Sequence, residues 1–147
     1  MKHQSQQQLA AAATTFPAPP QPRLSRRERI ERWATLLERH GGGLNALRRV
    51  EYLSPEERRE YRGLNTPLTV AFDDPVLREE GLKSDRLGDA MDFFELNDHD
   101  THLLLCDCRY QGTMTGSLLA SRLRQHMERK ERRSRLLNVV SRFFRFA

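Results

Sequence analysis

The chain has 147 residues, of which 25 are lysine or arginine and 20 are aspartate or glutamate, so its formal net charge is +5. This length suits a single domain, and no run approaches the roughly 20 apolar residues that a membrane-spanning helix needs, which excludes a transmembrane span. The 8 glycines and 7 prolines are too few for a fibrous or wholly disordered chain.

The charge is distributed unevenly along the chain. Residues 1–63 carry a net charge of +5, residues 64–108 carry −8 and residues 109–147 carry +8. The net charges of the acidic middle and the basic C-terminal part are equal and opposite, so the C-terminal part can fold back on the acidic middle. If it reaches outward instead, it offers a basic surface to a partner.

Residues 1–23 are predicted to be a disordered tail. They hold five glutamines, an alanine run over 10–13 and four prolines between Pro17 and Pro22, and such a stretch buries too little apolar surface to offset its ordering entropy. A signal peptide is disfavoured because glutamines interrupt its apolar core. Cys106 and Cys108 are too close for an unstrained mutual disulfide, which fits a reducing compartment, so we expect a cytoplasmic protein.

Residues 24–127 are predicted to form a helical domain. Ser25 and Glu28 form a capping box that starts the first helix, whose apolar positions recur at spacings of three and four: Ile30, Trp33, Ala34 and Leu37. Glycines 41–43 end this helix. A short second helix is expected over 44–53, because Leu44, Leu47 and Val50 have helical spacing, and Ser54-Pro55 starts a third.

The second half of this domain is also predicted to be helical, except for one extended segment. The segment Leu68–Phe72 reads Leu-Thr-Val-Ala-Phe and is expected to be extended and buried, since a lone strand has nothing to pair with. Further helices are expected to start at Asp74-Pro75, at Ser84 or Asp85, at Asn97-Asp98 and at Thr115. The sequence therefore predicts an all-α fold, a small irregular bundle of about six helices.

One cluster has the residue types of a metal or redox site: His99, His102, Cys106 and Cys108. Imidazole and thiolate are ligands that zinc prefers, and His99, His102 and Cys106 share one helical face. Ligands from neighbouring turns of one helix rarely surround an ion, however, so this site is carried as an alternative. A nucleophilic thiol is disfavoured because Asp107 would raise its pKa. We predict no catalytic residue, no metal and no cofactor.

Residues 128–147 are predicted to be a basic amphipathic segment that follows the helical domain. On a helix, Leu136, Val140, Phe143 and Phe144 line up and Leu137 lies beside them, while Arg135 and Arg142 lie off this line. We predict that these seven residues bind a partner, and that phenylalanines such as Phe144 and Phe146 are covered by something.

The predicted function is a non-enzymatic protein-interaction or regulatory module that uses this segment. In this interpretation the apolar side chains pack on a partner protein or on the protein's own core. One alternative is peripheral attachment to an anionic membrane, with phenylalanines at the acyl boundary and arginines at the headgroups. Another is nucleic-acid binding, in which basic residues neutralise phosphates: Arg129, Lys130, Arg132, Arg133 and Arg135.

Overall fold

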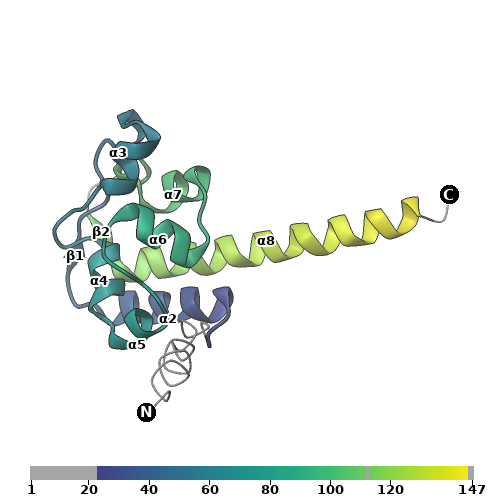
Figure 1. Cartoon of the computed structure of the whole chain (residues 1–147), viewed down its shortest axis with the longest axis horizontal. Helices are drawn as coiled ribbons and strands as arrows, with labels where there is room; N and C mark the ends of the chain where they lie inside the picture. Colours follow the sequence, from purple (N-terminus) through teal and green to yellow (C-terminus); the bar gives the residue numbers. More distant parts are fainter. Residues whose placement is uncertain (1–22, 112, 146–147) are drawn as a thin grey trace, which may run out of the picture.

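The computed structural model describes residues 23–111 and 113–145. Over these ranges it contains seven α-helices, two short 3₁₀ helices and one pair of two-residue strands, which confirms the all-α fold (Figure 1). The tail predicted for residues 1–23 falls outside the described residues apart from Arg23, as does Phe146. None of the described helices combines the length and the apolarity that crossing a membrane requires.

The elements follow one another with short links. In chain order they are α2 (Arg26–Arg39), β1 (Gly43–Leu44), η1 (Val50–Tyr52), α3 (Pro55–Glu60), α4 (Pro67–Asp73), α5 (Pro75–Glu79), α6 (Leu87–Phe94), α7 (Asp98–Leu105), η2 (Asp107–Arg109), β2 (Met114–Thr115) and α8 (Gly116–Phe144). The two strands pair antiparallel, with Gly43 opposite Thr115.

The most extensive packing between helices joins α2 to the first half of α8. The predicted capping box starts α2: the Ser25 hydroxyl accepts a hydrogen bond from the Glu28 amide, and the Glu28 carboxylate accepts one from the Ser25 amide. At the other end of α2, a Cβ atom on Gly116 would lie 1.8 Å from the Leu37 carbonyl oxygen. The two backbones therefore approach closely only because Gly116 has no side chain.

The core is formed by the buried faces of α2, α4, α6 and α8 around Trp33. The indole ring of Trp33 stacks on Phe94 with 4.4 Å between ring centroids, and its Nε1 donates to the Pro67 carbonyl at 2.9 Å. This bond satisfies the only polar atom of a fully buried indole. The residues of α2 that are buried are the four predicted from their spacing: Ile30, Trp33, Ala34 and Leu37.

The prediction that Leu68–Phe72 is extended is wrong, because these residues form most of α4. Thr66 caps this helix by accepting a hydrogen bond from the Thr69 amide, and Pro67 stands at its first turn. Pro67, Leu68 and Ala71 are buried against α2 and the rest of the core. The cap and the one-sided burial thus override the strand preference of Val70 and Phe72.

The helix predicted over 44–53 is also wrong. Leu44 belongs to β1, Arg49 adopts a left-handed conformation with φ of 55°, and only Val50–Tyr52 form a 3₁₀ turn. Leu44, Leu47 and Val50 are all buried nevertheless. Leu47 is held in an extended conformation by backbone hydrogen bonds on either side of Cys106, so its burial comes from pairing with a distant segment rather than from a helical face.

Most of the remaining predicted helix starts are confirmed. Ser54, Asp74, Asn97 and Thr115 each accept a hydrogen bond from an amide in the first turn of their helix. The exception is α6, whose N-cap is Arg86 and which lacks a side-chain cap. Ser84 instead accepts a hydrogen bond from the Arg86 amide and donates one to Asp89, while Asp85 pairs with Arg62.

Candidate functional site

The candidate site is the outer part of α8 with its C-cap Arg145, residues 128–145, which we call the arm; the rest of the described chain is called the body. The first half of α8 packs on the body of the protein through five buried residues: Gly116, Leu119, Ala120, Leu123 and Met127. Beyond this half every described residue from 132 to 145 is exposed. Figure 1 shows the helix continuing without a break past the body. The arm is therefore a continuous helical extension of a buried helix.

Ion pairs and one imidazole–carboxylate contact hold α8 against the body around the start of the arm. Arg124 bridges Glu31 and Glu38 of α2, and Arg27 lies 2.9 Å from Glu131. Lys130 Nζ lies 2.7 Å from Asp100 Oδ2, and His126 Nε2 lies 3.1 Å from Asp100 Oδ1. These contacts position the helix at the point where it leaves the body.

The acidic middle of the chain is largely neutralised without the arm. Arginines of α2 and of the α3 region pair with its carboxylates: Arg32 with Asp74, Arg29 with Glu95, Arg58 with Asp98, Arg59 with Asp92 and Arg62 with Asp85. From the arm, only Lys130 reaches an acidic residue of that segment, and no arginine from 132 onward has an ion pair among the described residues. In this structure the basic end thus reaches outward and does not fold back.

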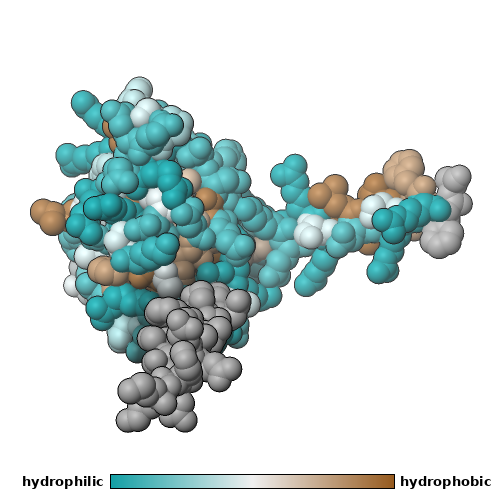
Figure 2. All heavy atoms as spheres, viewed as in Figure 1, coloured by the Kyte–Doolittle hydropathy of each residue, from teal (hydrophilic) through white to brown (hydrophobic). Residues whose placement is uncertain are grey.

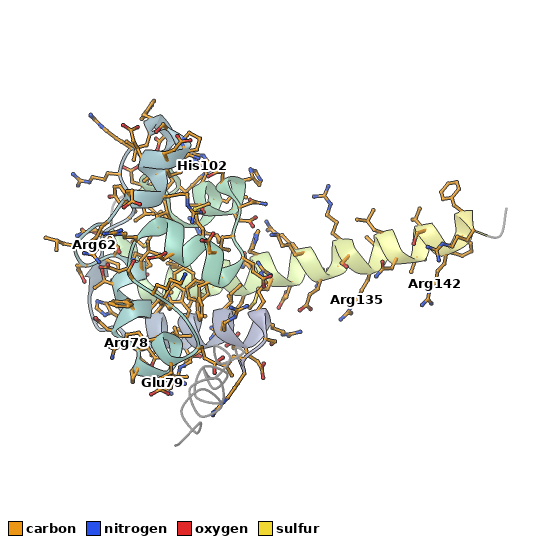
Figure 3. All side chains as sticks on the ribbon, in the orientation of Figure 1. Arg62, Arg78, Glu79, His102, Arg135 and Arg142 are labelled. Atoms are coloured by element: carbon orange, nitrogen blue, oxygen red, sulfur yellow. The ribbon has the colours of Figure 1, made fainter. Side chains whose placement is uncertain are left out.

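Six apolar side chains gather on one side of the arm, and we call them the apolar face: Leu136, Leu137, Val139, Val140, Phe143 and Phe144. Figure 2 shows hydrophobic side chains on one side of the arm, and Figure 3 shows Arg135 and Arg142 pointing to the other side. The structure thus brings together the five apolar residues predicted from their spacing, with the two predicted arginines on the flank. The sequence analysis did not include Val139 among the partner-binding residues, although it has helical spacing to them: it lies three residues after Leu136 and four before Phe143.

The apolar face points in a different direction from the face that packs on the body. Successive residues of an α-helix are rotated by about 100°, so the body-facing side of α8 continues along the arm mainly through polar residues: Lys130, Ser134, Asn138, Ser141 and Arg145. Leu137 lies at the edge of this side, about five turns after the buried Leu119. The apolar face is turned from that side by roughly a third of a turn. Apart from Leu137 at its edge, the apolar face is therefore not a continuation of the buried side of α8, and its side chains are exposed.

The predicted metal or redox cluster is brought together only in part. His102, Cys106 and Cys108 place their ligand atoms within 4.8 Å of one another, whereas His99 is exposed and does not join them. Glu51, from η1, lies beside Cys106 instead. Burial raises the pKa of the Cys106 thiol, and the side chains of Cys108 and Glu51 raise it further, while a hydrogen bond with the Cys108 backbone acts in the opposite direction. A thiol kept protonated in this way is a poor nucleophile.

A shallow cavity of about 360 Å³ lies beside the base of the arm, lined by Leu103, Leu104, Arg109, Arg122, Gln125, His126 and Arg129. Arg122 is already used within the fold, because its guanidinium lies 4.3 Å from the Tyr110 ring centroid and donates to the Arg109 carbonyl. Burial lowers the pKa of His126 in spite of the nearby Asp100 carboxylate. This cavity is basic, but much of its charge supports the packing of α8.

The arm is thus the described part of the chain that combines exposure, an apolar face and unpaired positive charge. Comparison of the sequence and the structure with models of protein families, with curated proteins and with solved structures finds no match.

Proposed function

We propose that this chain is a non-enzymatic protein-interaction module whose arm docks into an apolar groove with an acidic rim on a partner protein. The observation that carries this proposal is the apolar face, whose six side chains are 49–78% exposed on a helix that has left the body. Contiguous apolar surface of this kind marks interaction sites on soluble domains. An amphipathic helix that lays one face into a groove is a recurrent mode of peptide recognition.

The charges of the arm define the chemistry of the groove. No aspartate or glutamate occurs from residue 132 to residue 145, where the charged side chains are five arginines: Arg132, Arg133, Arg135, Arg142 and Arg145. By helical geometry, Arg132 and Arg133 lie on the same side as the apolar face, about one turn before Leu136. A complementary groove has an apolar floor and carboxylates at the end that receives these two arginines.

The same arrangement favours a protein groove over a lipid surface. A helix that lies in a membrane interface buries one apolar face and keeps its basic residues on the opposite side. Here Arg135 and Arg142 lie on the opposite side (Figure 3), but the apolar face covers only residues 136–144, about 13 Å of helix, and Arg132 and Arg133 precede it on the same side. Two arms of identical charge would also repel each other, which disfavours a second copy of the chain as the partner.

Photo-crosslinking in the source cell tests this proposal with a matched pair of positions. A photoreactive residue replaces Val140, on the apolar face, or Ser141, on the polar side of the same turn. We expect a defined protein adduct from position 140 and none from position 141, with aspartate and glutamate near the crosslinked site of the partner. The purified partner should bind the full chain, and F143A/F144A should weaken this binding by at least about tenfold.

Three results would contradict the proposal. Equal adducts from positions 140 and 141 would mean that the apolar face is not the contact surface. Tight co-sedimentation with vesicles of phosphatidylcholine and phosphatidylserine that is lost in F143A/F144A would identify a membrane as the target. Concentration-dependent dimerisation lost in the same variant would identify a second copy. In each assay Ser141→Ala is the control, because its side chain lies on the exposed polar side of the arm.

A further inference from the structure

The end of α7 brings two thiols, one imidazole and one carboxylate close together. Cys106 Sγ lies 3.2 Å from Cys108 Sγ and 3.1 Å from Glu51 Oε2. His102 Nε2 lies 3.8 Å from Cys108 Sγ. His102 is labelled in Figure 3, in the part of the body that Figure 1 labels α3 and α7. These groups come from two segments more than fifty residues apart in sequence.

Backbone hydrogen bonds hold the two segments in this arrangement. Leu47 donates to the Leu105 carbonyl at 2.9 Å and accepts from the Asp107 amide at 3.0 Å, so it brackets Cys106. Helix α7 ends at Leu105, Cys106 is extended, and the 3₁₀ turn η2 follows at Asp107–Arg109. This turn returns Cys108 towards the last turn of α7, where His102 lies. The cluster is therefore built by the fold and not by one helix.

We propose that His102, Cys106 and Cys108 bind one Zn²⁺ ion and that the Glu51 carboxylate turns in as the fourth ligand. Typical bonds of about 2.3 Å to sulfur and 2.0–2.1 Å to nitrogen place two ligand atoms of a tetrahedral site about 3.5–3.8 Å apart. The observed separation of the two sulfurs, 3.2 Å, is about half an ångström below the value for a sulfur pair, and the separation of 3.8 Å between His102 Nε2 and Cys108 Sγ is slightly above the value for a sulfur–nitrogen pair. All three ligand atoms lie within 4.8 Å of one another, so side-chain rotations that move the two thiols apart would admit the ion.

The surroundings also suit a cation. Asp107 Oδ1 lies 3.7 Å from Cys106 Sγ, so two carboxylates flank the buried sulfur. A positive ion offsets their repulsion of a thiolate, and mixed sulfur and nitrogen ligands select zinc over magnesium or calcium. Cys108 is exposed and gives the ion a route from solvent. The site would also tie η1 to the end of α7.

Metal titration of the full chain tests this site. The protein is reduced, stripped with a chelator and titrated with Zn²⁺ against a chromogenic competitor, and in parallel with Co²⁺. We expect one ion per chain, and for Co²⁺ a thiolate charge-transfer band with the intense visible bands of tetrahedral coordination. Cys108→Ser should weaken binding by more than about 100-fold, above the 10–100-fold that outer-shell changes typically cost.

Further variants separate ligands from neighbours. His102→Ala should weaken zinc binding, whereas His99→Ala on the same helix should leave it unchanged because His99 lies outside the cluster. Cys106→Ser alters a buried position and can impair folding, so the exposed Cys108 carries the decisive test. No binding at micromolar Zn²⁺, an octahedral Co²⁺ spectrum, or equal affinity of Cys108→Ser and wild type would overturn the proposal. Equal affinity of Glu51→Ala would remove Glu51 from the ligand set.

Discussion

Lys130 Nζ lies 2.7 Å from Asp100 Oδ2, and among the described residues this is the last hydrogen bond along α8 that joins it to α7. The Asp100 side chain is almost fully buried. Burial alone would raise the pKa of this carboxyl, but the hydrogen bonds from Lys130 and the Asn97 amide, together with His126, hold it below its usual range. Asp100 is therefore ionised and joins the start of α7 to α8.

Replacing Asp100 should destabilise the fold measurably. We expect Asp100→Asn to lower the free energy of unfolding by about 1–3 kcal/mol, because it weakens the cap of α7 and leaves Lys130 without its carboxylate. Asp98→Asn on the same helix is the control and should cost less than about 1 kcal/mol, because its ion pair with Arg58 is solvent-exposed at Asp98. Urea unfolding followed by Trp33 fluorescence measures both, and equal losses would contradict the role of Asp100.

His126 should make the stability of the protein depend on pH. Burial lowers its pKa, and Lys130, Arg26 and His99 act in the same direction, while Asp100 opposes them. The unfolded chain therefore binds a proton on this histidine before the folded protein does. Stability should fall as pH decreases below about 6.5, the ordinary pKa of histidine. His126→Gln should flatten this part of the profile, and parallel profiles for the variant and wild type would contradict the prediction.

The close approach of α2 and α8 should make Gly116 intolerant of any side chain. A Cβ atom there would overlap the Leu37 carbonyl, so Gly116→Ala forces the helices apart and should cost more than about 2 kcal/mol. Gly41→Ala is a suitable control, because a Cβ atom at Gly41 would meet nothing within 4 Å. Thermal unfolding compares the two, and a Gly116→Ala protein as stable as wild type would show that the interface can shift.

The two halves of α8 should respond differently to truncation of apolar side chains. Leu123 is 1% exposed, so Leu123→Ala should cost about 2–5 kcal/mol. Phe144 is 78% exposed, so Phe144→Ala should change stability by less than about 0.5 kcal/mol. Chemical denaturation of the isolated protein measures both. A large loss for Phe144→Ala would mean that the apolar face is covered within the protein itself.

The two cysteines should differ in reactivity in the metal-free protein. Cys108 is exposed and Cys106 is buried, so iodoacetamide at neutral pH should alkylate Cys108 first. Peptide mass spectrometry after a short exposure identifies the labelled position. Faster labelling of Cys106 would show that the turn around it opens readily, and unfolding in urea should abolish the difference.

The parts of the fold that were predicted correctly depend on neighbouring residues. Ser25, Ser54 and Thr115 each cap a helix through an amide three residues further along the chain. The apolar face of the arm is also a local pattern, because helical spacing alone aligns Leu136, Val140 and Phe144. Such features depend little on the rest of the molecule and are visible in the sequence.

The parts that were missed depend on segments that are distant in sequence. Leu68–Phe72 has strand-forming residues, and only burial against α2 together with the Thr66 cap makes it helical. The residues next to Glu51 in sequence give no indication that it belongs to a site. Glu51 reaches Cys106 because Leu47 pairs with the segment after α7. Helical spacing placed His99 with His102, but the end of α7 at Leu105 moves the two thiols off the face that His99 occupies.

The rotation between the body-facing side of α8 and the apolar face also determines on which side of the body a partner lies. Because no loop interrupts α8 between Met127 and Leu136, the helix itself fixes the direction of the apolar face relative to the body. Inserting one alanine after Ser134 would turn the apolar face by about 100° and advance it by only about 1.5 Å. Binding to an isolated groove would survive such an insertion, whereas an assembly in which the body also contacts the partner would lose its alignment.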